Sequence, residues 1–375
     1  MKQKVKLKDI ASYSKGSQIN GTELIENGEF DYLNGGINPS GKWNEANCNA
    51  DTIAISEGGN SCGYVNYMRK PFWCGAHCYY LYDTVANTKY LYYALKSQQE
   101  RIMKLRSGAC MPNIKKSDLG NFEFIFDDDD KQQKNTTDIL NKIERVIELR
   151  QKEIFYLDEL VKARFVEMFG DPQLNPKGWK VVNISEVVGG KVSNGFFAKR
   201  DDYVNDGNVS VLGVANIVNR MYSKIDELPR TNADDNEIKK YEVKYGDMLF
   251  CRSSLVAEGI GKASIIPENV QKNILFECHV IRLQLDLNKC VPEFMQTLST
   301  MDSFRNQVIA QSKTATMTTI GQDGILKTDI ILPPLESQRK FYNFIKQVNK
   351  SKSAIKKSLE ETQILFDSLM QKYFS

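Results

Sequence analysis

Several turns of this sequence are rich in Asn, Ser, Gly, Tyr and Lys, whose polar groups can hydrogen-bond to base edges and phosphates. In the first part of the chain, the candidates for such contacts are Lys15, Tyr32, Asn34, Asn38, Lys42, Asn60, Ser61, Tyr64 and Arg69. In the second part they are Phe197, Lys199, Arg200, Asn216, Asn219, Arg220, Arg252, Ser253, Ser254 and Lys262. The alternative for each residue is an ordinary solvated loop position, and for Arg252 it is also a structural hydrogen-bond donor.

Two further patterns raise the question of metal binding. Cys74, His77 and Cys78 are the nearest approach to a zinc site, but the eight cysteines include no Cys-x-x-Cys pair. Small buried residues on a strand are the simpler interpretation. The acidic run Asp127 to Asp130 could chelate Mg²⁺, yet carboxylates also stabilise the N-terminus of a following helix, and we favour that interpretation. We therefore expect no metal site.

Catalytic motifs are missing from the sequence. No Gly-x-x-x-x-Gly-Lys-Ser/Thr stretch is present, which argues against a P-loop ATPase. There is also no Asn/Asp-Pro-Pro-Tyr/Phe motif of the kind that amino-methyltransferases carry. The chain has two histidines, and no Ser/His or Cys/His set has a third member to support it. We therefore expect neither a catalytic residue nor a cofactor in this chain.

Length and composition are typical of a two-domain globular protein. The 375 residues exceed the usual size of a single hydrophobic core. The formal net charge of +3, from 50 Lys plus Arg and 47 Asp plus Glu, permits local basic patches without proving nucleic-acid binding. No apolar run can span a membrane, and the basic start lacks the apolar stretch of a signal peptide. We therefore expect a cytoplasmic protein without membrane contact.

An internal repeat organises the chain. A shift of 205 residues superimposes a segment near the middle on the end of the sequence, and both segments carry apolar residues at heptad positions a and d. In the first segment these are Leu140, Ile143, Ile147, Ile154, Leu157, Val161 and Met168. In the second they are Ile345, Val348, Ile355, Leu359, Phe366, Leu369 and Tyr373. We expect two long helices that pair as an antiparallel coiled coil. Arg150 and Arg164, also at d, would reach outward or pair with acidic residues of the other helix.

The repeat continues upstream of each helix. A shift of 206 pairs Ile114 with Ile320, and a shift of 202 pairs His77 with His279. Short apolar runs separated by Gly, Asn and Ser turns indicate strands, and one helix is expected in each copy, near 88–106 and 292–310. The fold class is therefore α+β, with two pseudo-repeated globular domains separated by the long helices. The expected boundaries are 1–131 and 171–336 for the globular domains and 132–170 and 337–375 for the helices.

Four stretches, in this order, resemble the specificity subunit of type I restriction-modification systems. They are Ile55-Ser56-Glu57-Gly58-Gly59-Asn60-Ser61-Cys62-Gly63-Tyr64-Val65, the run from Leu157 to Asp171, Gly246-Asp247-Met248-Leu249-Phe250-Cys251-Arg252-Ser253-Ser254, and Ile331-Leu332-Pro333-Pro334-Leu335-Glu336 before the last helix. One departure is that the first copy has Phe126-Asp127-Asp128-Asp129-Asp130 where the second has Leu-Pro-Pro-Leu-Glu. Arg252 and Asn60 are the favoured DNA contacts, because each follows one of the family-like strand motifs.

The resemblance implies a non-catalytic, sequence-specific DNA-binding subunit that serves in defence against foreign DNA. Each target recognition domain would read one half of a bipartite double-stranded target. The paired helices would space the domains and dock two adenine-N6 methyltransferase subunits. S-adenosylmethionine, ATP and Mg²⁺ would then belong to partner subunits, which include a restriction subunit. Two alternatives from other classes are a stand-alone DNA-modifying enzyme and a helical scaffold protein without sequence readout.

Overall fold

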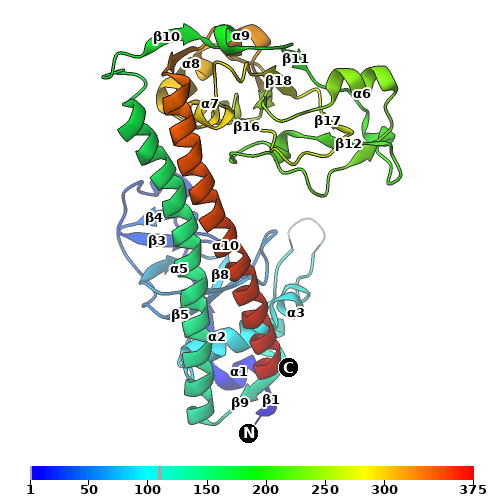
Figure 1. Cartoon of the computed structure of the whole chain (residues 1–375). Helices are drawn as coiled ribbons and strands as arrows, with labels where there is room; N and C mark the ends of the chain where they lie inside the picture. Colours follow the sequence, from blue (N-terminus) through cyan, green and yellow to red (C-terminus); the bar gives the residue numbers. More distant parts are fainter. Residues whose placement is uncertain (1, 109–111) are drawn as a thin grey trace. The chain divides into compact units, whose positions relative to one another are not determined.

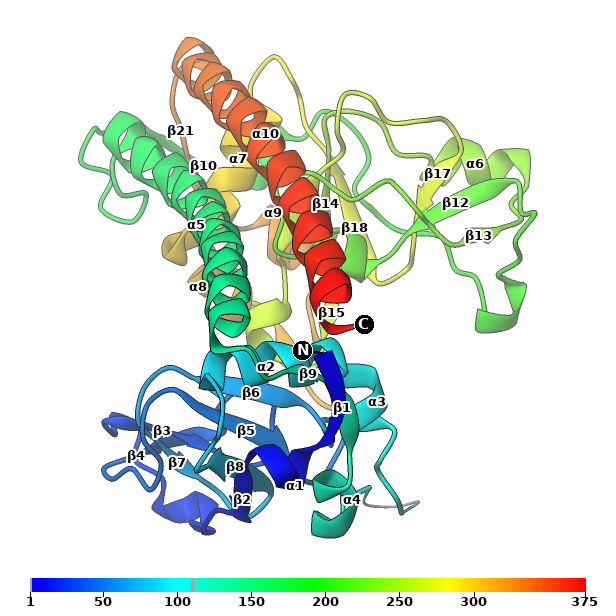
Figure 2. The same ribbon diagram turned by 90° about the horizontal axis from the view of Figure 1, so that it is seen from below.

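The computed structural model describes residues 2–108 and 112–375 (Figures 1 and 2). The chain forms two compact units, one made of Met1–Lys152 with Lys356–Ser375 and the other of Glu153–Ile355. Each unit contains one globular domain and parts of two long helices, α5 (Asp130–Phe169) and α10 (Leu335–Phe374).

The globular domain of the first unit is built on a four-stranded sheet of order β2-β8-β5-β6, with smaller sheets β4-β3-β7 and β1-β9. Its elements are β1 (Lys2–Lys6), α1 (Leu7–Ile10), β2 (Ser12–Lys15), η1 (Gly21–Glu23), β3 (Phe30–Leu33), β4 (Gly41–Trp43), β5 (Thr52–Ser56), β6 (Val65–Met68), β7 (Phe72–Cys74), β8 (Cys78–Tyr82), α2 (Thr88–Ser97), α3 (Gln99–Met103), α4 (Lys116–Gly120) and β9 (Glu123–Asp127). Strand β5 is buried throughout its apolar part because α2 covers one face and β3 and β7 lie toward the other.

The globular domain of the second unit repeats this plan, with the order β11-β18-β14-β16 in the main sheet and β13-β12-β17 and β10-β21 beside it. Its elements are β10 (Lys180–Asn183), η2 (Ile184–Val187), β11 (Ser193–Asn194), η3 (Arg200–Asp202), β12 (Val209–Leu212), η4 (Val214–Asn216), β13 (Arg230–Thr231), α6 (Asp235–Tyr241), β14 (Asp247–Cys251), β15 (Ser253–Ser254), η5 (Ala257–Gly259), β16 (Ala263–Ile265), β17 (Ile274–Phe276), β18 (Val280–Gln284), α7 (Pro292–Ser299), α8 (Asp302–Ala310), β19 (Lys313–Thr314), β20 (Thr318–Thr319), α9 (Gln322–Leu326) and β21 (Asp329–Leu332). The predicted two-copy α+β fold is confirmed.

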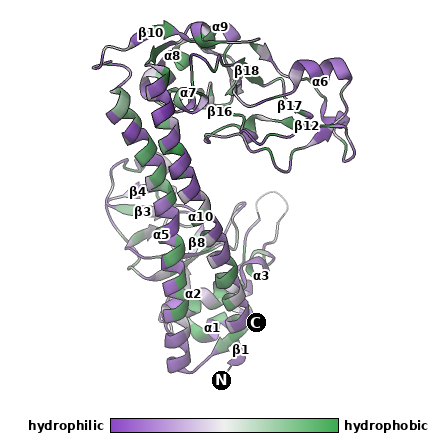
Figure 3. Ribbon diagram, viewed as in Figure 1, coloured by the Kyte–Doolittle hydropathy of each residue, from purple (hydrophilic) through white to green (hydrophobic). Residues whose placement is uncertain are grey.

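The two long helices are equivalent from end to end. Each has 40 residues, and the shift of 205 that matches their sequences also matches Asp130 with Leu335 and Phe169 with Phe374. Figure 3 shows hydrophobic and hydrophilic residues interspersed along both helices. In the first copy the acidic run precedes the helix, as expected. The carboxylate of Asp129 accepts hydrogen bonds from the backbone N–H groups of Lys131 and Gln132, and so caps the helix start.

In the first unit the helices lie antiparallel. Leu140 of α5 shares a buried cluster with Met370 and Phe374 of α10. Ten residues further along α5, Arg150 donates a hydrogen bond to the carbonyl oxygen of Ser358 at 2.6 Å. The contact on α10 thus moves toward its N-terminus as α5 advances.

In the second unit the same direction holds. Asp158 of α5 pairs with Lys352 of α10 at 2.5 Å, and Phe165 packs against Phe341 with ring centres 5.5 Å apart. The predicted antiparallel coiled coil is therefore confirmed. All of the seam residues named from the heptads are buried or half-buried.

The arginines at heptad d positions behave differently from the two alternatives that the sequence left open. Arg150 reaches across the seam, but its acceptors are a backbone carbonyl and the hydroxyl of Thr362 rather than a carboxylate. Arg164 pairs with Glu167 of its own helix at 2.7 Å and lies over the ring of Phe344. Within the described ranges, an ion pair across the seam is made instead by Lys352.

The single helix expected in each globular domain is a pair of consecutive helices. The chain turns at Gln98 between α2 and α3, and at residues 300–301 between α7 and α8. These turns carry Ile102 and Phe304 into the two cores, where both are buried. Pro292 occupies the first turn of α7, as its fixed φ angle favours.

Candidate nucleic-acid interface

In the first globular domain, three sequence-predicted residues meet at the ends of β2, β3 and β5. The Nζ of Lys15 lies 2.8 Å from Oε1 of Glu57. Asn34 accepts a hydrogen bond from the backbone N–H of His77 at 3.1 Å, and Ser61 donates one to the carbonyl oxygen of Gly35. Loops that are distant in sequence are therefore tied into one surface, where Lys15 and His77 are exposed.

The remaining candidates of this domain lie apart from that surface or at its margin. Asn38 and Asn60 are exposed on adjoining turns, and Lys42 lies 3.6 Å from Asp31 on the β3–β4 hairpin. Tyr32 is buried at the core and bonded to the backbone of Ile19, and burial raises its pKa. Tyr64 lies under the ammonium of Lys96, and Arg69 is bound to helix α5.

In the second globular domain, the equivalent surface is formed by the residues that follow β14 and precede β18. Ser253 and His279 share a hydrogen bond of 2.7 Å between Oγ and Nδ1. Arg252 donates through Nη1 to the carbonyl oxygen of Cys278 at 3.2 Å. Glu277 accepts from the backbone N–H of Val214 at 2.8 Å, which ties the β12 loop to the same edge.

The other candidates of this domain flank that edge. Phe197 is 68% exposed, directly after a buried Phe196. Lys199 and Arg200 are exposed at η3, and Lys262 donates to Asn219 at 2.8 Å. Asn216 closes a turn by accepting from Gly213, Arg220 donates to the carbonyl oxygen of Val218, and Ser254 lies on β15 opposite β20.

Backbone hydrogen bonds show that the two surfaces are built alike. The N–H of Glu57 donates to the carbonyl oxygen of His77 at 2.7 Å, and that of Arg252 donates to the carbonyl oxygen of His279 at 2.9 Å. The same backbone position therefore carries a carboxylate, Glu57, in one domain and a guanidinium, Arg252, in the other.

Upstream in the second domain, Gly195 must be glycine, because an added Cβ would lie 2.2 Å from the carbonyl oxygen of Phe276.

Sequence reasoning missed some residues at the centre of these surfaces. Glu57 and Glu277 hold the loops together, and neither was a predicted contact. The pairing of His77 with His279 by a constant shift was the available signal, because it marked equivalent positions next to both carboxylates.

The contact between Ser253 and His279 is a pair of side chains. Among the residues that the structure describes, no carboxylate is within hydrogen-bonding distance of the His279 ring, so a third member to orient the base is lacking. Within residues 2–108 and 112–375 there is likewise no group of three or more His, Cys, Asp or Glu side chains that could hold a metal ion. In that part of the chain no helix is long and apolar enough to cross a membrane. The surfaces offer hydrogen-bond donors, acceptors and charge.

The sequence matches the family described as the type I restriction modification DNA specificity domain, over residues 2–157 and 176–364. The chain belongs to this family. The two globular domains are accordingly its target recognition domains, and DNA sequence recognition is the activity that the family implies.

Relatives agree with this assignment. A putative type I specificity subunit of Mycoplasma pneumoniae is 31% identical over 240 residues, which cover 59% of this chain and 63% of that protein. Another from Mycoplasma genitalium is 36% identical over 162 residues, covering 39% of this chain and 42% of that one. The chain thus spans less than two thirds of the curated relatives it matches. A crystal structure of the type I restriction-modification S subunit from M. genitalium matches with a TM-score of 0.60 at 19% identity, over 100% of this chain and 96% of that one, which shows the shared fold.

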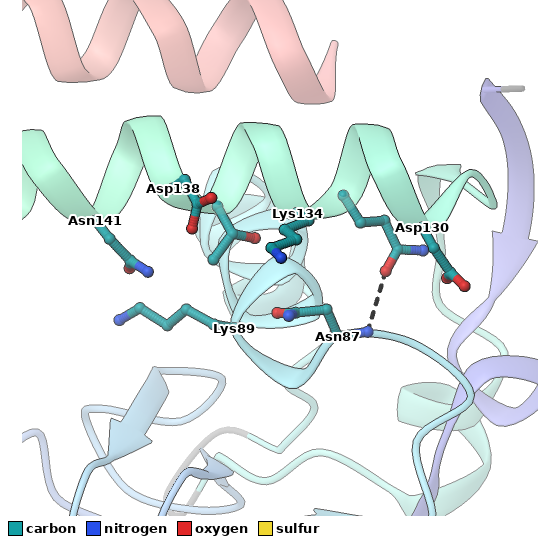
Figure 4. Close-up of a pocket in the computed structure, with 8 residues that line it drawn as sticks. Asn87, Lys89, Asp130, Lys134, Asp138 and Asn141 are labelled. Carbon is teal, nitrogen blue, oxygen red and sulfur yellow. Dashed lines mark hydrogen bonds between the residues drawn. The ribbon is translucent and has the colours of Figure 1, made fainter.

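A charged network attaches the first recognition domain to α5. Glu144 Oε2 lies 3.0 Å from Lys89 Nζ and 3.0 Å from Arg69 Nη2, and it accepts from the hydroxyl of Tyr93 at 3.2 Å. Figure 4 shows Lys89 of α2 and Asn141 of α5 beside a polar pocket of about 440 Å³ between these helices. Burial lowers the pKa of Lys89, and Glu144 supplies the opposite charge that it needs.

Proposed function

We propose that this chain is the non-catalytic specificity subunit of a type I complex, in which each recognition domain reads one half of a bipartite DNA target. The observation that carries the proposal is the pair of equivalent surfaces with different side chains. The exposed side chains on this shared framework differ, with Lys15, Asn38 and Asn60 in the first domain and Phe197, Lys199 and Arg200 in the second. Different side chains favour different base edges in the major groove. An asymmetric split target requires two recognition surfaces that share a backbone framework but carry different side chains.

Chemistry on the DNA is assigned to partners in this proposal. Two adenine-N6 methyltransferase subunits would bring S-adenosylmethionine, and a restriction subunit would bring ATP and Mg²⁺. To test this, the chain is purified together with a methyltransferase encoded beside it and given a library of duplexes. We expect N6-methyladenine only in duplexes that share a split sequence. Methylation by the chain alone, or methylation without sequence preference by the pair, would contradict the proposal.

Exposed apolar side chains on the long helices support docking of two methyltransferase copies. Leu160 on α5 and Leu365 on α10 are equivalent under the 205-residue shift, lie outside the seam, and are 47% and 51% exposed. They belong to different units, so each unit offers one such site. Further exposed apolar residues are Val146, Leu149, Phe155, Tyr156 and Val166 on α5 and Ile364 on α10.

We expect Leu160→Asp or Leu365→Asp to reduce the bound methyltransferase from two copies to one, because a charge opposes burial of the apolar contact. The double variant should bind none. Native mass spectrometry of the mixed subunits measures the stoichiometry directly. Gln151→Asp is the control, since nine residues place it on the opposite face of α5 from Leu160. Full binding of two copies by the double variant would exclude these sites.

A matched deletion tests whether the helices set the spacing between half-sites. Residues 147–153 of α5 and 357–363 of α10 form one heptad on each helix and include Arg150 with both of its acceptors. Removing both segments keeps the seam in register and shortens each helix by about 10 Å at ~1.5 Å per residue. We expect the unread spacer to lose about three base pairs at ~3.4 Å each. Sequencing of methylated sites reads the result, and changed half-sites with an unchanged spacer would contradict it.

A further inference from the structure

The second recognition domain contains a basic pocket that is lined by the C-terminal end of α6 and the last residues of β18. Its volume is about 450 Å³, and its charged lining residues are Lys191, Lys239, Lys240, Lys244, Arg282 and Glu242. Five cationic side chains therefore share a small concave surface with one carboxylate. Such an excess of positive charge favours an anion.

Arg282 forms the buried base of this pocket. It is 5% exposed and its guanidinium lies 4.9 Å from the ring centre of Phe276. Its Nη1 donates to the carbonyl oxygen of Glu242 at 2.7 Å and its Nη2 to that of Lys240 at 2.9 Å. These two bonds fix the guanidinium plane at the C-terminal end of α6.

One donor of this fixed guanidinium is unused. The Nε of Arg282 is buried and has no hydrogen-bond acceptor among the residues that the structure describes. Asp247 lies 3.8 Å from Nη1 and leaves Nε without a bond. A buried donor without an acceptor is unfavourable. Oδ1 of the neighbouring Asp247 is also buried without a partner among the described residues, so a water molecule or a ligand oxygen is expected beside these groups.

The lysines at the rim are available to the same ligand. Lys191, Lys239 and Lys244 are exposed, and within residues 2–108 and 112–375 their ammonium groups have no carboxylate partner. Lys240 lies over the ring of Tyr241, with its Nζ 4.8 Å from the ring centre. Flexible ammonium groups around one rigid guanidinium suit a phosphate, which accepts several charge-assisted hydrogen bonds at once.

Among the residues that the structure describes, the first recognition domain does not repeat the arginine and the helix that line this pocket. The backbone equivalence of His77 with His279 places Tyr80 where Arg282 stands. The chain between Trp43 of β4 and Thr52 of β5 forms no helix, so the counterpart of α6 is missing as well. The basic pocket is therefore a feature that α6 adds to the second domain.

We propose that this pocket binds a phosphate group, and that its source is the backbone of the duplex held by the second recognition domain. The assignment to DNA rests on the proposed function, whereas the phosphate chemistry rests on the pocket itself. A backbone contact would fix the position of this domain on the duplex without reading any base. The pocket would thus add affinity to one half-site of the target and leave its sequence unchanged.

The test uses the complex of the full chain with its methyltransferase. In the triple variant Lys191→Gln, Lys239→Gln and Lys244→Gln, duplex affinity should fall by about five- to tenfold at physiological salt. The slope of log affinity against log salt should become shallower by about 0.9, the value for one phosphate. The methylated sequence should stay the same. A lost or changed sequence preference, or an unchanged slope, would overturn the proposal.

A matched control removes the same charge elsewhere in the domain, through Lys180→Gln, Lys289→Gln and Lys327→Gln. If the slope of log affinity against log salt decreases equally in this control, the effect comes from the general loss of charge. That result would overturn the assignment of the phosphate site to this pocket. Calorimetric titration with inorganic pyrophosphate separates the two sources. If wild-type complex binds no DNA but the pocket lysines are required for pyrophosphate binding, the proposed function fails and the phosphate site stands with a free ligand. Binding of neither would overturn both.

Discussion

Phe165→Ala should destabilise the second unit by about 3–5 kcal/mol, the usual cost of removing a buried phenyl ring. Phe165 of α5 is fully buried, and its ring centre lies 5.0 Å from that of Phe169, 5.5 Å from Phe294 and 5.5 Å from Phe341. These partners come from α5, α7 and α10, so one ring joins both long helices to the second recognition domain. Its loss leaves a cavity that three separate elements would have to close.

Urea unfolding measures this effect if the signal comes from the right unit. Trp179 serves for this purpose, because its indole Nε1 donates to the carbonyl oxygen of Phe169 at 2.9 Å. Replacing Trp43 and Trp73 by Phe leaves Trp179 as the sole tryptophan. Phe155→Ala is the control, since Phe155 lies on the same helix and is 59% exposed. We expect a change within about 0.5 kcal/mol there. Equal effects of the two substitutions would contradict the assigned role of the Phe165 cluster.

The architecture was predictable because the two copies of the repeat can be compared with each other. Heptads give a helix and its buried face from local spacing alone, and the 205-residue shift then placed both helix ends. The shift of 206 paired Ile114 with Ile320, and both side chains are buried in their own cores. The shift of 202 paired His77 with His279, whose backbone carbonyls accept equivalent hydrogen bonds.

The sites were less predictable because their contacts join residues far apart in the chain. Arg69 has the type expected of a DNA contact, yet it binds Glu148 at 2.6 Å on a helix that begins some sixty residues later. Arg282 sits within an apolar strand pattern, and only its proximity to α6 gives it a part in a pocket. Neither spacing nor residue type carries that information. Burial and hydrogen-bond partners supply it.

Glu144→Ala should cost about 2–4 kcal/mol in the first unit, because removing one partner strands a buried charge. The side chain of Lys89 is 13% exposed and its Nζ lies 4.1 Å from the ring centre of Tyr67. Without Glu144 the ammonium group of Lys89 still contacts the tyrosine ring but loses the carboxylate that pairs with it. Thermal unfolding measures the loss. Glu148→Ala is the control on the next turn of α5, since Glu148 pairs with the half-exposed Arg69 and should cost at most about 1 kcal/mol.

A double-mutant cycle separates the charge pair from the packing. If Glu144→Leu with Lys89→Met recovers most of the stability lost in either single variant, the cost came from the unpaired charge. Additive losses would instead assign the cost to packing of Lys89 against Tyr67, Tyr92 and Tyr93, whose ring centres lie 4.1, 4.6 and 4.9 Å from its Nζ. The double variant should restore stability but not recognition. The two substituted apolar side chains would still hold the first recognition domain on α5, but without the directional hydrogen bonds that Glu144 makes. We therefore expect the Leu/Met variant to fold and to relax discrimination at the first half-site only. Equal relaxation at both half-sites would show that this network does not orient the first domain.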